Sequence, residues 1–146
     1  MTLRRCVFVL LGFMLLCAGA HAESQVTEPD STRGEHKIIA FYFYFSPRCE
    51  TCLNMEVYSK QAVQKGFAAE VKKGQVEWQS LDIEEAEHKH FWNDYNLETK
   101  SLVIVDILNG KQVRWKNCQQ IWDLAEDKRA FQDYVIAEIK AYLMPE

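Results

Sequence analysis

The stretch YFSPRCETCLN, residues 44–54, places Cys49 and Cys52 three positions apart directly behind an apolar run. That run, KIIAFYFYF at 37–45, would be apolar on both faces of a strand, and it is rich in aromatic and β-branched residues. It predicts a central strand buried on both faces, which a Ser-Pro dipeptide then ends. A helical pattern follows over about 51–73. The two cysteines therefore stand between a buried strand and the start of a helix.

The rest of the chain predicts a regular order of further elements. In sequence they are a break or kink of the first helix near Gly66, a strand at 76–83, a helix at 84–95, a strand at 101–107, a hairpin turn at Asn109-Gly110, a strand at 112–116, a short helix at 119–125, and a helix capped by Asp127 that runs to about 143. The first strand–helix–strand unit predicts a parallel pair, and the hairpin adds an antiparallel pair. We expect an α/β fold with a four-stranded mixed sheet and helices on both faces.

The first 22 residues have the pattern of a secretory signal peptide. A basic start precedes a 15-residue apolar run at 6–20, and Ala20-His21-Ala22 is a small-residue cleavage site. The run is shorter than the roughly 20 residues of a transmembrane span, although a membrane anchor or lipid attachment through Cys17 is an alternative. We expect cleavage after Ala22, a flexible polar leader at 23–36, one domain at 37–146, and an exported, periplasmic protein.

Charge and cysteine content narrow the function further. Loss of the two arginines in the signal leaves 15 basic and 21 acidic residues, a net charge of −6. This balance does not favour nucleic-acid binding, which uses basic patches. Cys49, Cys52 and Cys118 remain, in a compartment where disulfides persist. Three is odd, so one thiol has no partner within the domain.

A strand that ends in Cys-x-x-Cys at the start of a helix, followed by this order of elements, resembles the thioredoxin fold over about 37–143. The stretches RCETC (48–52), DYNLETKSLVIVDILNGKQVRWKN (94–117) and DKRAF (127–131) are more narrowly similar to the exported nitrophenyl-compound nitroreductase subunit (ArsF-type) family. This second resemblance implies an electron-transfer subunit of nitroaromatic reduction. Its partners would be redox proteins, such as a membrane electron transporter and a flavoprotein. Because the chain has no Gly-rich nucleotide loop, we expect no cofactor besides the cysteine pair, and no nitro reduction by the chain alone.

The resemblance to thioredoxins implies redox roles for the two cysteines. Cys49, at the helix N-terminus, would attack a partner disulfide, and Cys52 would resolve the mixed disulfide. The helix end and Arg48 favour the Cys49 thiolate, whereas Glu50 opposes it. We therefore expect a mildly depressed Cys49 pKa. The dipeptide between the cysteines, Glu50-Thr51, differs from the one usual in thioredoxins.

The same pair has two other interpretations. A structural disulfide would make the chain a non-catalytic binding or assembly subunit, although so short a loop constrains the unfolded chain little. A metal or metalloid carrier is the third possibility. Zinc prefers four ligands, and Cys49, Cys52 and Cys118 with His88 or His90 do not have the usual spacing of a zinc site.

Lys100, Ser101 and Cys118 are predicted to lie near the pair, because the third strand starts and the fourth ends at the edge where the first strand delivers Cys49. Lys100 stands where thioredoxins usually carry a cis-proline. A cis bond there would cost about 2.5–4 kcal/mol, so we expect a trans peptide. Lys100 is either a stabiliser of a thiolate or an ordinary loop lysine. Cys118 is either a third redox thiol or a small buried apolar residue.

Overall fold

The computed structural model describes residues 35–144, so the predicted signal peptide and nearly all of the predicted leader lie outside the described residues. The elements run in the order β1 (His36–Tyr44), α1 (Glu50–Gly66), α2 (Ala68–Lys72), β2 (Val76–Asp82), α3 (Phe91–Asp94), β3 (Ser101–Leu108), β4 (Lys111–Asn117), the 3-10 turn η1 (Gln119–Ile121) and α4 (Lys128–Leu143). The strands form one sheet in the order β2-β1-β3-β4. The β1–β2 pair is parallel, and the other two pairs are antiparallel.

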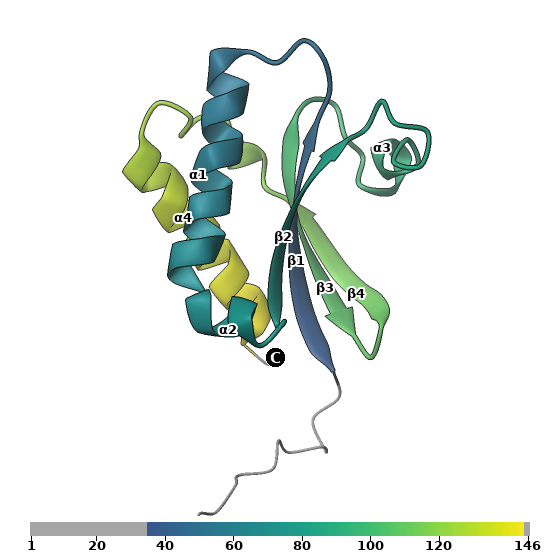
Figure 1. Cartoon of the computed structure of the whole chain (residues 1–146), viewed down its shortest axis with the longest axis vertical. Helices are drawn as coiled ribbons and strands as arrows, with labels where there is room; N and C mark the ends of the chain where they lie inside the picture. The colour runs from purple at the N-terminus through teal and green to yellow at the C-terminus, as the bar shows by residue number, and fades with distance from the viewer. Residues whose placement is uncertain (1–34, 145–146) are drawn as a thin grey trace, which may run out of the picture.

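Two cores lie on opposite faces of this sheet. Figure 1 shows α1 and α4 side by side on one face and α3 on the other. On β1 the side chains of Ile38, Ala40 and Tyr42 join the core beneath α1 and α4, whereas those of Phe41 and Phe43 join the core on the α3 side. This doubly buried strand is the one predicted from the apolar run. The strand order, the parallel first pair and the helices on both faces make the fold thioredoxin-like, as predicted.

Turns and helix ends also fall where the sequence places them. The first long helix is divided, with α1 ending at Gly66, where a Cβ atom would lie only 2.9 Å from Cγ1 of Ile136 on α4. Asn109 and Gly110 both have positive φ, as a tight hairpin turn requires. The Asp127 carboxylate caps α4 by accepting two backbone N–H bonds. Within residues 35–144, no helix combines the length and apolarity needed to cross a membrane.

The helix expected at 84–95 is a correction, because only Phe91–Asp94 is helical and the chain before it forms successive turns. Side chains compete there for backbone groups that a helix would use. The Asp82 carboxylate accepts from the Glu84 N–H at 2.9 Å, and His88 Nδ1 lies 2.9 Å from the Asp82 carbonyl oxygen. Such local side-chain bonds offer the backbone an alternative to helix. The acidic start of this segment was therefore a turn signal.

Candidate functional site

The cysteine pair lies at one end of the sheet, the edge formed by the ends of several strands and not by an outer strand. The last residue of β1, Tyr44, is paired with Asp82 at the end of β2, and Phe43 is paired with Ser101 at the start of β3. Val103 of β3 is paired with the last residue of β4. The loop after β1 turns at this edge into α1. Cys49 is thus delivered to the edge at which β3 starts and β4 ends.

Cys49 and Cys52 form a disulfide, with Cα atoms 5.1 Å apart. Cys49 is exposed and is the N-cap of α1, whereas Cys52 is buried at 2% exposure in the first turn. The Cys52 N–H points at the Cys49 sulfur, at 3.2 Å. Backbone N–H groups at a helix N-terminus stabilise negative charge, and thiolates in this position are more acidic than free thiols. The arrangement therefore suits an accessible nucleophilic sulfur with a protected second sulfur behind it.

A buried tyrosine fixes the first turn of α1 to the sheet. The Tyr42 hydroxyl donates a hydrogen bond of 2.7 Å to the Cys52 carbonyl oxygen. Burial, and after it the negative charge of Glu56, raises the pKa of Tyr42 well above its ordinary value. The hydroxyl therefore keeps its proton and remains a donor. The backbone of Cys52 is therefore anchored to the central strand.

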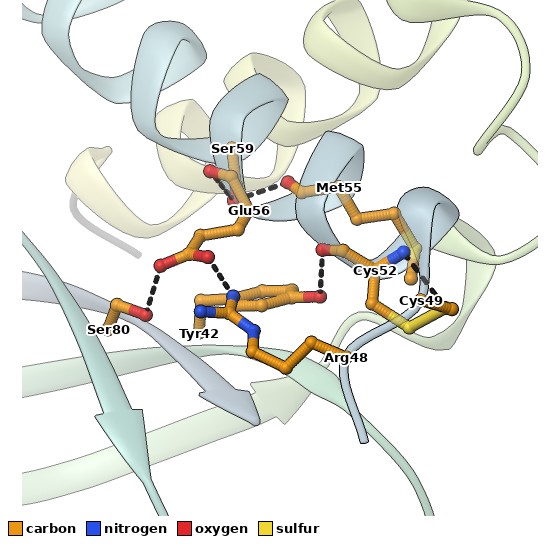
Figure 2. A network of polar contacts seen from close by, with 8 residues as sticks. All are labelled: Tyr42, Arg48, Cys49, Cys52, Met55, Glu56, Ser59 and Ser80. Carbon is orange, nitrogen blue, oxygen red and sulfur yellow. Dashed lines mark hydrogen bonds and ion pairs between the residues drawn. A yellow bond between two sulfur atoms is a disulfide. The ribbon is translucent and has the colours of Figure 1, made fainter. Parts of the chain in front are cut away.

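Arg48, expected to favour a Cys49 anion, is engaged elsewhere. Its Nη2 atom forms an ion pair with Glu56 Oε2, and its guanidinium carbon lies 4.0 Å from the Tyr44 ring centroid. The other Glu56 oxygen accepts a hydrogen bond of 2.5 Å from the Ser80 hydroxyl. Figure 2 shows the guanidinium extending toward Glu56 and away from the disulfide. The positive charge of Arg48 is thus paired with the Glu56 carboxylate and not with the Cys49 sulfur.

Lys100 lies at this edge, directly before β3. The peptide bond before it is trans, as expected, since Ser46-Pro47 is the one cis bond among residues 35–144. The residue is only 7% exposed, and its Nζ lies 3.9 Å from the Phe45 ring centroid. Its carbonyl oxygen accepts a bond of 3.1 Å from Trp122 Nε1. The ammonium group is therefore packed on an aromatic ring, and the backbone is tied to the segment after β4.

Ser101 and Cys118 both lie at this edge but face opposite cores. Ser101 is buried, and its hydroxyl donates to the Thr99 carbonyl oxygen at 2.8 Å. Cys118 is fully buried in the core beneath α1 and α4, and its N–H donates to the Leu102 carbonyl oxygen. Burial, with the Glu138 charge, raises the pKa of Cys118 to about 12. A thiol that stays protonated favours the small buried apolar interpretation of Cys118.

The three cysteines do not assemble a metal site with other ligands. Among residues 35–144, the one group of three or more potential ligand side chains whose ligand atoms lie within 4.8 Å is Glu85, Glu87 and His88, which is largely exposed. No cysteine belongs to it. His88, the conceivable fourth ligand of a cysteine site, groups with the two glutamates and not with the cysteines.

Sequence reasoning missed three residues of this site. Tyr42 was assigned to the core without its hydroxyl bond, and Glu56 and Ser80 were given no role. Two signals were present. Glu56 follows Cys52 by four positions, so the two share a helix face. Ser80 ends an inward-facing series of β2 that is otherwise apolar, and it pairs with Tyr42.

No protein-family model and no curated protein sequence matches this chain. Among solved structures, a malarial protein aligns over 74% of this chain and 99% of its own, with 13% identity and a TM-score of 0.45. Thioredoxin f2 of Chlamydomonas reinhardtii aligns over 80% and 86%, with 13% identity and a TM-score of 0.40. A thioredoxin from Thermus thermophilus aligns over 62% and 72%, with 12% identity and a TM-score of 0.35. The fold assignment rests on the strand order and connections described above.

Proposed function

We propose that this chain is an exported thiol–disulfide redox protein in which Cys49 and Cys52 pass two electrons between protein partners. The observation that carries the proposal is the asymmetry of the pair. Cys49 is exposed at the N-terminus of a 17-residue helix and its sulfur accepts a backbone N–H bond, while Cys52 is buried three residues later. Thiol–disulfide exchange needs one accessible thiolate and one protected resolving thiol.

The proposed reaction begins with the reduced pair. The Cys49 thiolate attacks one sulfur of a partner disulfide, which forms a mixed disulfide and releases the first partner sulfur as a thiolate. Cys52, after losing its proton to solvent or buffer, attacks the Cys49 sulfur and releases the second partner sulfur. The partner gains two electrons and the pair becomes the Cys49–Cys52 disulfide. The reverse sequence reloads the pair from a donor.

The short loop supports a reactive pair over a structural staple. A disulfide stabilises a fold mainly by closing a long loop in the unfolded chain, and three residues of separation close almost none. The domain also has two apolar cores on a four-stranded sheet, so its stability has other sources. We therefore place the structural role second.

Export and the wider pathway belong to the same proposal. The signal-like sequence at 1–22 supports a periplasmic location, where a membrane electron transporter would supply electrons. The resemblance of 48–52, 94–117 and 127–131 to nitroreductase subunits supports a flavoprotein acceptor in a nitroaromatic reduction system. In this proposal the Cys49–Cys52 disulfide is the redox group that the chain contributes. Purified reduced protein alone should leave a nitrophenyl compound unreduced.

Two measurements test the proposal. The wild-type protein should titrate between dithiol and disulfide in a glutathione redox buffer and should accelerate insulin reduction by dithiothreitol. Cys49→Ser should abolish both activities, and Cys52→Ser should accumulate mixed disulfides. Cys118→Ala is the matched control and should retain both activities. A pair that stays oxidised in reducing buffer, with no insulin reduction, would instead indicate the structural role.

A further inference from the structure

We infer that Glu56 sets the acidity of Cys49 indirectly, by holding the Arg48 guanidinium away from the Cys49 sulfur. The inference deepens the proposed redox function and rests on it. Glu56 does not touch the reacting sulfur atoms in this arrangement. It is a positioning residue that acts through Arg48.

Two contacts hold the guanidinium in place, and a third orients the carboxylate that it binds. Glu56 Oε2 forms the ion pair with Nη2 of Arg48, and the Tyr44 ring lies beneath the guanidinium at 4.0 Å. Ser80 binds the second Glu56 oxygen and so orients the carboxylate from the neighbouring strand. The Arg48 and Glu56 side chains are 27% and 20% exposed. Partial burial means that solvent and salt screen this pair less than a surface pair.

The alternative position of Arg48 is beside the sulfur. Arg48 precedes Cys49 directly, so rotation of its side chain is enough to bring the guanidinium to a Cys49 thiolate. A cation within about 4–6 Å typically lowers the pKa of an acidic group by about 1–3 units. By occupying Arg48, Glu56 keeps the Cys49 thiol less acidic. A less acidic attacking thiol stabilises the reduced form less, so the pair is more reducing than it would be with Arg48 released.

Other charges near the pair stay constant in the test. Glu50 lies in the first turn of α1, and the Glu84 carboxylate accepts a bond from the Ser46 N–H in the loop before Cys49. The Lys100 ammonium is packed on Phe45. The N-terminus of α1 adds its own partial positive charge. None of these is altered by changing Arg48, Glu56 or Ser80.

The test measures the Cys49 pKa from thiolate absorbance in a Cys52→Ser, Cys118→Ala background. Glu56→Gln should lower it by about one unit, because Arg48 is released. Arg48→Met alone should change the Cys49 pKa little, because the Arg48 guanidinium is already paired with the Glu56 carboxylate. With Met at position 48, Glu56→Gln should move the pKa by less than about a third as much as with Arg48 present.

This double-mutant cycle separates the inference from simple electrostatics. Removal of the carboxylate charge also acts directly on Cys49, and that part is the same with either residue at position 48. Equal shifts in the two backgrounds would overturn the inference. A rise of the Cys49 pKa in Arg48→Met of about one unit would also overturn it, because Arg48 would then already act on the sulfur.

Ser80→Ala provides a second route that keeps both charges. Loss of the Ser80 hydrogen bond loosens Glu56, so the Cys49 pKa should fall in the same direction by a smaller amount. Far-UV circular dichroism checks that each variant is folded. If Glu56→Gln does not fold, the Ser80→Ala result decides, and an unchanged or raised pKa in that variant would contradict the inference.

The redox equilibrium gives an independent readout in protein that keeps Cys49 and Cys52. Glu56→Gln should shift the equilibrium with glutathione toward the dithiol by up to about tenfold, which equals a rise in potential of up to about 30 mV for two electrons. A shift toward the disulfide would count against the inference. The Cys49 pKa is measurable in reduced protein even if the pair exchanges with no partner. Failure of the proposed function is therefore distinguishable from failure of this inference.

Discussion

The Tyr42 hydroxyl and the Cys52 carbonyl oxygen are 2.7 Å apart, in a buried hydrogen bond that joins the central strand to the first turn of α1. Cys52 is the buried member of the pair, so this bond anchors the backbone of the cysteine that solvent does not reach. Ser80 pairs with Tyr42 on the neighbouring strand and binds Glu56 one turn further along α1. Strand and helix are thus linked by side chains on both sides of the Tyr42 ring (Figure 2).

Tyr42→Phe should lower the free energy of unfolding of the oxidised protein by about 0.5–1.5 kcal/mol, because it removes one buried hydrogen bond and leaves the ring in place. The loss stays within this range because a helical N–H is also available to the Cys52 carbonyl oxygen. Urea unfolding measures the change. Tyr58→Phe is the matched control, since that partly buried ring packs edge-on against Phe131 of α4, away from Cys52. Equal effects of the two substitutions would argue against a special role for the Tyr42 bond.

Local sequence patterns were enough to predict most of the fold. The apolar run of β1, the Asn109-Gly110 turn and the Asp127 cap each depend on neighbours within a few residues. Cys49 was also correctly placed at the start of a helix. The failed segment was 84–95, where side chains bind backbone groups and the periodicity of the aromatic residues resembled a helix. Turn chemistry outweighed the hydrophobic pattern there.

The polar contacts of the site required the tertiary structure. Arg48 and Glu56 are eight positions apart, and Glu56 and Ser80 are 24 apart. Their meeting depends on the exact packing of α1 over the parallel β1–β2 pair. The sequence places a cation beside Cys49 but does not show which anion it contacts. The prediction that Arg48 favours the Cys49 thiolate was therefore made without the group that competes for it.

Lys100→Met should lower the free energy of unfolding by about 1–2 kcal/mol, because it removes the contact between the buried ammonium group and the face of the Phe45 ring. Phe45→Leu should be coupled to it in a double-mutant cycle, measured by urea unfolding. We expect a small change in the Cys49 pKa, because the ammonium lies on the ring. Additive effects together with a strongly raised Cys49 pKa would instead favour a direct action of Lys100 on the thiolate.

Cys118 should make the protein less stable as the pH rises above about 9. Its folded-state pKa is raised from the ordinary value of 9.0 to about 12, so the unfolded chain loses this proton first. Between these values the unfolded state binds fewer protons, and the free energy of unfolding falls by up to about 1.4 kcal/mol per pH unit from this group. Tyrosines with raised pKa values add to the fall.

The contribution of Cys118 is isolated by comparison with Cys118→Ala. The stability advantage of the wild type over this variant should shrink between about pH 8 and about pH 10, measured by urea unfolding of the oxidised proteins. Iodoacetamide should label Cys118 in denaturant and leave it unlabelled in the folded state. Rapid labelling of the folded protein near neutral pH, or a wild-type advantage that grows with pH, would contradict a buried protonated thiol.

A buried carboxylate toward the other end of the strands offers a test that separates stability from redox function. Asp106 is 4% exposed and lies 2.8 Å from both His36 Nε2 and Arg114 Nε. Arg114 also packs on the Tyr142 ring. Arg114→Met should lower the free energy of unfolding by about 1.5–3 kcal/mol, because it removes a charged hydrogen bond from a buried carboxylate. Urea unfolding measures the loss.

Asp106→Asn introduced into Arg114→Met should recover part of that loss, because a neutral amide is less costly to bury than a carboxylate with one partner fewer. The part that is not recovered includes the packing of Arg114 on the Tyr142 ring and its hydrogen bond to the Tyr142 carbonyl oxygen. The dithiol–disulfide equilibrium of Cys49 and Cys52 should stay at the wild-type value in both variants. Asp106 pairs with Ile38 near the start of β1, several residues of extended strand, or roughly 20 Å, from the loop that carries Cys49. No recovery in the double variant would place the main cost in the Tyr142 contact and not in the buried charge.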